Sequence, residues 1–158
     1  MSKINIFCFG FGQVAEGFIN KLIQEKKDFD LSITSREETH QIELNNFKIT
    51  SYHFTDDKFD SSIDKKLKEA NYILISIPPI EGKDIVAKYF DKNLQGITNC
   101  KWITYLSATS VYGDHKGEWV NENSTTKPTS PNGSNRLAAE NTWKKLSNKH
   151  KYPLQIFR

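Results

Sequence analysis

Two glycines near the beginning of the chain have the spacing of a phosphate-binding turn. They open a G-x-G-x-x-A pattern, Gly10-Phe11-Gly12-Gln13-Val14-Ala15. The first glycine permits a tight turn, the second lets a pyrophosphate approach the backbone, and the small Ala15 lets a helix pack closely on a strand. The N–H groups and the positive dipole end of that helix then face the phosphates. The same residues are also compatible with a plain structural turn.

The residues around this turn predict a strand before it and a helix after it. Residues 4–9 form an unbroken run of apolar and β-prone residues, typical of a strand covered on both faces in a parallel sheet. Buried parallel strands need crossover helices. The helix follows at once, with four apolar residues spaced to lie on one face: Val14, Phe18, Leu22 and Ile23.

The end of the second expected strand, residues 31–36, bears on the choice of dinucleotide. At this position, about 20 residues past the glycines, an Asp or Glu binds the ribose 2′-hydroxyl of NAD, whereas an Arg accommodates the 2′-phosphate of NADP. The strand ends in Thr34-Ser35-Arg36, and two hydroxyls with a guanidinium suit a phosphate. We therefore expect NADP, with NAD as the alternative because Glu37 comes next. In the remaining interpretation, Arg36 is an exposed arginine with no part in cofactor binding.

Alternating strands and helices continue along the chain and predict the fold. Residues 38–46 are expected to be helical or irregular. The other expected strands are residues 47–54, 72–77, 101–107 and 153–158, and the other expected helices are residues 59–70, 81–90 and 134–147. This alternation is typical of an α/β protein. We predict a three-layer Rossmann fold with a doubly wound parallel sheet of about six strands, in one domain over residues 1–158.

Two segments after strands are further candidates for dinucleotide contacts. Asp56 follows the strand at residues 47–54, where a carboxylate can reach an adenine amino group. The same segment, Thr55-Asp56-Asp57, also fits the N-cap of the helix at residues 59–70, which is the favoured role. Ser76-Ile77-Pro78 ends the clearest buried strand in a rigid turn where ribose and pyrophosphate can lie. His53 is expected to be a strand side chain and not a ligand.

Composition narrows the classes of partner. The formal charge of +3 is small and dispersed, with no basic stripe, so we expect no nucleic-acid binding. No apolar run approaches membrane-spanning length, and the beginning of the chain does not resemble a signal peptide. Cys8 and Cys100 lack the spacing of a disulfide framework or a metal site. We expect a soluble, cytoplasmic protein without a metal.

Two longer motifs lie in the last third of the chain. The first is Ser107-Ala108-Thr109-Ser110-Val111-Tyr112-Gly113, and the second ends in Leu137-Ala138-Ala139-Glu140. With the glycine turn, they resemble the extended short-chain dehydrogenase/reductase family, the NAD-dependent epimerase/dehydratases, over essentially the whole chain. The resemblance implies NAD(P) binding and oxidoreductase-like chemistry on a carbonyl, an alcohol or a sugar-nucleotide type of substrate.

The family's catalytic positions carry other residues in this chain. The family uses a Tyr for proton transfer, a Lys four residues later that lowers its pKa, and a Ser or Thr that orients the substrate. Carried over, these positions fall on Asn132, Arg136 and Ala108. An amide does not titrate near neutral pH, and a guanidinium stays protonated and has no phenol to activate. The chain therefore resembles the atypical branch of the family.

Neighbouring groups are candidates to replace the missing ones. Ser107, Thr109 and Ser110 flank the empty serine position, Tyr112 supplies a phenol, and His115 titrates near neutral pH. The favoured interpretation is that Tyr112 packs in the Val-Tyr-Gly turn and that His115 is a loop side chain without a catalytic role. We expect NADP(H) binding with oxidoreductase-like activity from a degenerate active site. The alternative is a non-catalytic NADP(H)-binding sensor or regulator, and a structural scaffold is a third possibility. The missing Tyr and Lys favour the sensor, and the retained glycine turn disfavours the scaffold.

The last strand is where the family's second lobe begins. In the family, the strand matching residues 153–158 continues into a loop and a substrate-binding lobe. We expect the chain to be either a truncated piece of a longer protein, which is favoured, or a stand-alone nucleotide domain. The substrate, an unknown small molecule, is selected by that lobe. The helix at residues 134–147 is a candidate surface for a homodimer.

Overall fold

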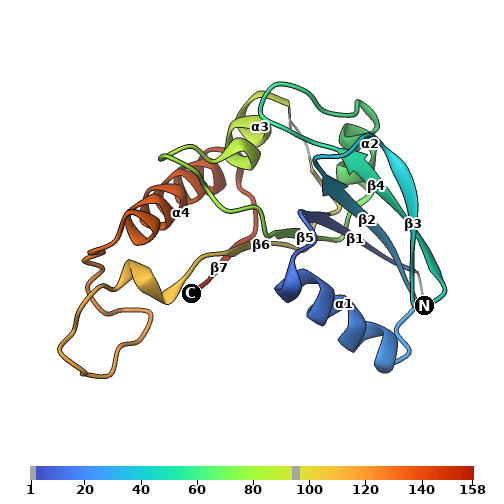
Figure 1. Ribbon diagram of the computed structural model, residues 1–158. Helices are drawn as coiled ribbons and strands as arrows, with labels where there is room; N and C mark the ends of the chain where they lie inside the picture. Colours follow the sequence, from blue (N-terminus) through green and yellow to red (C-terminus); the bar gives the residue numbers. More distant parts are fainter. Residues whose placement is uncertain (1–2, 94–96) are drawn as a thin grey trace.

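The computed structural model describes residues 3–93 and 97–158 and forms one twisted sheet between two layers of helices (Figure 1). Its strands lie in the order β3-β4-β2-β1-β5-β6-β7. The strands are β1 (Ile4–Phe9), β2 (Phe29–Ser35), β3 (His40–Leu44), β4 (Phe47–His53), β5 (Tyr72–Ile75), β6 (Trp102–Leu106) and β7 (Leu154–Phe157). The helices are α1 (Gln13–Gln24), α2 (Ser62–Glu69), α3 (Ile85–Asn93), α4 (Pro131–His150) and the 3₁₀ turn η1 (Thr109–Val111).

Six of these strands are parallel, as the sequence predicted, and β3 is an additional antiparallel strand at one edge. Central strand β1 shows why the last four residues of its sequence, 6–9, are all apolar. Phe7 and Phe9 pack into one core cluster and Ile6 and Cys8 into the other, all less than 5 % exposed. A parallel strand covered on both faces has no solvent-facing positions for polar residues.

The two faces of the sheet are covered unequally. Helices α2, α3 and α4 pack on one face, where the core includes an aromatic cluster around Phe90 and Trp143. Helix α1 packs on the other face through Ala15 and Ile19. The predicted apolar face of α1 was partly wrong, because Val14 is 64 % exposed and Phe18 is 40 % exposed. The small Ala15 brings the helix onto the sheet and leaves those two side chains at its flank.

The prediction that residues 38–46 are helical or irregular was wrong where β3 lies. His40–Leu44 pairs antiparallel with β4 through a turn at Asn45-Asn46, both with positive φ. Exposed Gln41 and Glu43 alternate with partly buried Ile42 and Leu44, which is a period-two pattern. Asparagines tolerate the left-handed conformation that a tight hairpin requires. The strand is short and polar enough that its pairing depends on β4.

Three helices have boundaries that differ from the predicted ones. Helix α2 begins at Ser62 and not at 59, and α3 begins at Ile85 and not at 81. Before α3, Glu81 and Gly82 have positive φ, in a turn that is incompatible with a helix. Helix α4 is longer than predicted, because Ser130 caps it by accepting a hydrogen bond from Gly133 N. Within the described ranges no helix has both the length and the apolar character needed to cross a membrane.

Candidate functional site

The glycine turn lies at the carboxyl end of β1, clamped between the ends of β2 and β5. Gly10 has φ +78°, and a Cβ there would lie 2.9 Å from Ile77 Cγ1. Its N–H donates to Thr34 Oγ1 at 2.9 Å. Only glycine meets both the left-handed backbone and the close contact with Ile77. The sequence suggested the Thr34 hydroxyl as a partner for a phosphate, whereas in the structure it accepts from the glycine turn.

The second glycine begins α1 and leaves room in front of it. Gly12 is the N-cap residue, with φ −84° and ψ −178°, and no side chain caps the helix. A Cβ on Gly12 would come within 4 Å of Ser76 Oγ alone among the described atoms, at 3.7 Å. Gln13 and Val14 are exposed beside it, and Phe11 is half-buried. An uncapped helix N-terminus with space before it fits a pyrophosphate group.

The end of β5 lies directly against this turn. The N–H groups of Ser76 and Ile77 both donate to Phe9 O, at 2.9 and 3.2 Å. This pairing brings Ser76, Ile77 and the exposed Pro78 to the same edge of the sheet as Gly10. The predicted pyrophosphate and ribose contacts therefore come together in space from segments more than sixty residues apart in sequence.

The segment after β4 caps its helix differently from the prediction. Asp60, and not Thr55-Asp56-Asp57, accepts from the first helical N–H, that of Ser62, at 2.8 Å. Asp57 instead accepts from the Thr55 hydroxyl at 2.9 Å. Asp56 Oδ1 lies 2.5 Å from Lys88 Nζ on α3. The N-cap prediction for this segment was wrong, and the contact of Asp56 with an adenine remains a prediction.

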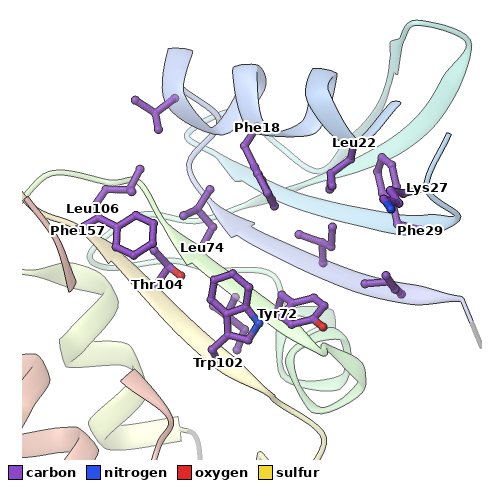
Figure 2. Close-up of a pocket in the computed structure, with 14 residues that line it drawn as sticks. Phe18, Leu22, Lys27, Phe29, Tyr72, Leu74, Trp102, Thr104, Leu106 and Phe157 are labelled. Carbon is purple, nitrogen blue, oxygen red and sulfur yellow. The ribbon is translucent and has the colours of Figure 1, made fainter. Parts of the chain in front are cut away.

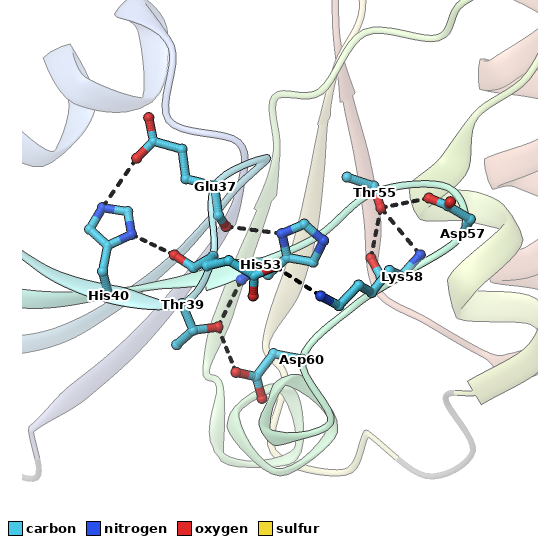
Figure 3. A network of polar contacts seen from close by, with 9 residues as sticks. Glu37, Thr39, His40, His53, Thr55, Asp57, Lys58 and Asp60 are labelled. Atoms are coloured by element: carbon cyan, nitrogen blue, oxygen red, sulfur yellow. Dashed lines mark hydrogen bonds and ion pairs between the residues drawn. The ribbon is translucent and has the colours of Figure 1, made fainter.

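The loop after β2 is held by a polar network around His53 (Figure 3). The His53 ring Nδ1 lies 3.0 Å from Glu37 O, and the backbone N–H of His53 donates to Thr39 Oγ1 at 3.0 Å. Thr39 in turn donates to Asp60 at 2.6 Å. His53 is thus a buried strand side chain, as predicted. The network fixes the backbone that carries the two candidate selectivity residues, Arg36 and Glu37.

Arg36 and Glu37 differ in what their side chains contact. Glu37 Oε2 lies 3.6 Å from His40 Nε2 on β3. Arg36 is exposed and makes no hydrogen bond or ion pair with any residue that the structure describes. Ser35 Oγ accepts from Ser51 Oγ at 3.0 Å, which orients its hydroxyl. Both side chains are open to solvent at the end of β2, and Arg36 offers there a cation without a polar partner, which suits an anionic ligand.

A buried carboxylate organises the region of the second motif. Glu140 on α4 is fully buried and receives two hydrogen bonds from Arg158, at 2.9 and 2.7 Å, and one from the Ser107 hydroxyl at 2.6 Å. Burial acts to raise the pKa of Glu140, but the bonds from Arg158 and Ser107 outweigh it, and the pKa is lowered. The bidentate geometry is the strong form of an arginine–carboxylate pair.

The same arginine also holds the predicted phenol. Arg158 Nη1 donates to Tyr112 Oη at 3.1 Å, and the guanidinium lies over the Tyr112 ring. Through Glu140 and Arg158 the structure brings Ser107 and Tyr112 into one network. Sequence reasoning missed the role of these two charges, because a Glu followed four residues later by Lys144 looks like a solvent-exposed helix pair.

The other predicted catalytic residues make no hydrogen bond to Glu140 or Arg158 among the described residues, although the His115 ring packs edge-on against Tyr112. Asn132 is exposed in the first turn of α4, and Thr109 is exposed in η1. Arg136 Nη1 donates to Leu106 O at 2.5 Å, at the end of β6. His115 Nε2 lies 3.1 Å from Thr125 O within its loop. Neither the Asn132 amide nor the Arg136 guanidinium supplies a general acid or base in place of the family's tyrosine and lysine.

A doubly wound sheet with a glycine turn at the carboxyl end of its first strand defines a Rossmann fold. Solved structures of sugar-nucleotide epimerases, the class of protein that the motifs resemble, share this fold over nearly the whole chain, and so does a conserved protein of unknown function. No protein-family model matches the sequence, and no curated protein does.

Three solved structures illustrate the likeness. A conserved protein of unknown function from Silicibacter pomeroyi matches 97 % of this chain at 26 % identity and TM-score 0.73. The UDP-N-acetylglucosamine 4-epimerase of Methanobrevibacter ruminantium matches 100 % at 18 % identity and TM-score 0.74. The UDP-glucuronic acid 4-epimerase of Bacillus cereus, solved with NAD, matches 97 % at 16 % identity and TM-score 0.68. The chain spans 51 %, 55 % and 55 % of these proteins respectively, about half of each.

Proposed function

We propose that this chain binds NADP(H) at the glycine turn, with the 2′-phosphate on Arg36. The observation that carries this proposal is the free guanidinium of Arg36 beside a Glu37 carboxylate that faces His40. Selection of NAD would require an acidic side chain directed at the ribose 2′-hydroxyl. NAD in the B. cereus epimerase supports a dinucleotide as the ligand, and Arg36 supports the phosphorylated form.

The remaining contacts follow from the edge of the sheet. The pyrophosphate would lie on the N–H groups that begin α1, next to Gly12, Gln13 and Val14. Ser76, Ile77 and Pro78 would line the ribose side, and Phe11 and Ser35 would flank the adenosine half. Asp56 is the candidate for the adenine amino group. When bound, the nicotinamide supplies a hydride donor or acceptor.

We infer that the function is binding without turnover, in the manner of a sensor or regulator. Asn132 and Arg136 supply no general acid or base, and the hydroxyls of Ser107 and Tyr112 are engaged by Glu140 and Arg158. The second candidate is an oxidoreductase acting on a carbonyl, an alcohol or a sugar-nucleotide type of substrate, which the matches to UDP-sugar epimerases favour. It requires a proton donor other than the family's tyrosine.

Titration with NADPH and NADH, followed by nicotinamide fluorescence, tests the proposal. Arg36→Ala should weaken NADPH binding about 10- to 100-fold, the value of a charge-assisted hydrogen bond, and leave NADH binding unchanged. Gly12→Asp should abolish binding of both, because it places a carboxylate against the phosphates. Lys48→Ala, another exposed cation on the neighbouring strand, is the control. Equal NADPH affinity in Arg36→Ala and the wild type would refute the assignment of the phosphate.

A further inference from the structure

The glycine turn is joined to strand β2 by a side chain. The backbone pairs of β1 and β2 end at Cys8 and Ile33, just before the turn. Beyond that pair, the Gly10 N–H points toward β2 and donates to Thr34 Oγ1 at 2.9 Å. A threonine hydroxyl thus takes the place that a backbone carbonyl has in a parallel pair of strands.

The conformation of Gly10 has to be selected by its neighbours. Glycine adopts positive and negative φ about equally readily, so its own preference does not favour the observed φ of +78°. On one side, Ile77 lies so close that a Cβ would meet its Cγ1 at 2.9 Å. On the other side, the bond to Thr34 fixes the peptide plane that precedes Gly10. Two neighbouring strands therefore hold the turn between them.

Thr34 is suited to hold this turn because its own position is fixed. It is 1 % exposed and pairs with Tyr52 of β4. Its branched Cβ restricts the side chain to few rotamers. One residue further on, Ser35 O accepts from the Phe54 N–H at 2.8 Å, which holds the end of β2 against the segment after β4. The hydroxyl is therefore a rigid acceptor for the Gly10 N–H.

We propose that Thr34 is a positioning residue for the dinucleotide and acts through Gly10. The inference rests on the proposed NADP(H) site and names the residue that keeps its phosphate-binding turn ready. Gly12 and the N-terminus of α1 follow Gly10 directly, so a turn released at Gly10 misplaces the N–H groups that face the pyrophosphate. When only a fraction of the molecules has the binding-competent conformation, affinity falls by that fraction.

This role differs from that of Arg36 in its effect on the two dinucleotides. NADPH and NADH share the pyrophosphate, whereas the 2′-phosphate belongs to NADPH alone. Loss of the Thr34 hydroxyl should therefore weaken both ligands by the same factor. Loss of the Arg36 guanidinium should weaken NADPH alone.

Three variants test the role of the hydroxyl. Thr34→Val replaces it with a methyl group in a side chain of nearly the same shape, and Thr34→Ser returns it. Thr104→Val is the matched control, because Thr104 is a threonine of parallel strand β6, only 5 % exposed, whose hydroxyl bonds to no residue that the structure describes. Figure 2 shows Thr104 in the groove between α1 and the strands β5, β6 and β7, which Phe18 and Leu22 also line.

Affinities for NADPH and NADH are measured by nicotinamide fluorescence, after circular dichroism has shown that each variant folds. Thr34→Val should weaken both about fivefold to tenfold, the effect of one lost hydrogen bond, whereas Thr34→Ser and Thr104→Val should bind like the wild type. Wild-type affinity in Thr34→Val would overturn the inference. So would a loss confined to NADPH, or an equal loss in Thr34→Ser or Thr104→Val.

Hydrogen exchange of the Gly10 amide, followed by NMR without ligand, separates this inference from the proposed function. The amide should exchange about tenfold faster in Thr34→Val than in the wild type, while the amides of β5 keep their rates. If Thr34→Val does not fold, Thr34→Ala takes its place in both measurements. Unchanged exchange at Gly10 overturns the inference and leaves NADP(H) binding intact, whereas a wild type that binds neither dinucleotide overturns the proposed function itself.

Discussion

Glu140 shows how much one side chain contributes to the arrangement of the second motif. It joins the end of β6 through Ser107, the end of β7 through Arg158, and the Val-Tyr-Gly turn through Arg158 and Tyr112. A buried carboxylate is tolerated only when it is paired and hydrogen-bonded, and here both oxygens have partners. Ser107 and Tyr112 are thus held in place by the hydrogen bonds of Glu140 and Arg158.

Glu140→Gln should destabilise the fold substantially, by about 2–4 kcal/mol, because it leaves the Arg158 guanidinium largely buried without a counter-charge. Urea unfolding followed by circular dichroism measures the difference. Glu43→Gln, on the exposed side of β3, is the matched control and should stay within about 0.5 kcal/mol of the wild type. A loss at Glu140 no larger than that at Glu43 would show that the network is not a source of stability.

The stabilisation that Glu140 provides should also depend on pH. The pKa of Glu140 is lowered from 4.5 in the folded state, so its contribution is fully present above that value and is lost as the pH falls through the folded pKa. The stability difference between wild type and Glu140→Gln should therefore be constant above about pH 5 and shrink as the pH falls below about 4.5. Urea unfolding at several pH values measures it, and a constant difference would contradict the assignment.

At the scale of elements, Asp84 links two helices. Its Oδ1 accepts from the N–H groups of Val86 and Ala87, which begin α3, and its Oδ2 accepts from Trp143 Nε1 on α4 at 2.9 Å. Burial raises the pKa of Asp84, against the effect of these bonds. One carboxylate thereby caps a helix and fixes the packing of α3 on α4.

Asp84→Ala should cost about 2–4 kcal/mol, since it removes the cap and leaves the Trp143 N–H unpaired. Asp84→Asn keeps the oxygen that caps α3 but turns an amide donor toward the indole N–H. It should therefore lower the free energy of unfolding by less than Asp84→Ala does. Ser61→Ala is the control, because Ser61 is the N-cap residue of α2 and makes no side-chain cap bond. Thermal and urea unfolding rank the three variants, and a loss in Ser61→Ala equal to that in Asp84→Ala would refute the argument.

At the scale of the whole molecule, the sheet has a protected centre and two weaker edges. Strand β1 pairs on both sides and is buried on both faces, whereas β3 pairs only with β4 and has exposed side chains. Backbone amides of β1 should exchange with solvent roughly a hundredfold more slowly than the amides on the unpaired side of β3. This corresponds to a difference of about 2.7 kcal/mol in the free energy of opening. Hydrogen exchange followed by NMR measures this, and equal protection of the two strands would contradict it.

The sequence alone determined the parts of this protein that depend on local pattern. The glycine spacing, the unbroken apolar run of β1 and the alternation of elements predicted the Rossmann fold and its six parallel strands. These features are local because the conformations of glycine and the periods of helix and strand act over a few residues. The edge strand β3 was missed, although its alternation was visible, because a short polar strand forms only when a neighbour pairs with it.

Only the tertiary structure decided which charges are paired and which face lacks a cover. Glu140 and Arg158 lie eighteen residues apart, and the sequence gives no sign that they pair. The contact of Glu37 with His40 on β3 likewise joins two strands and cannot be predicted from local pattern. The spacing of apolar residues in α1 predicted a single packed face, yet Val14 and Phe18 line an open groove. Such facts depend on contacts between distant segments, since hydrogen bonding and burial are properties of neighbours in space.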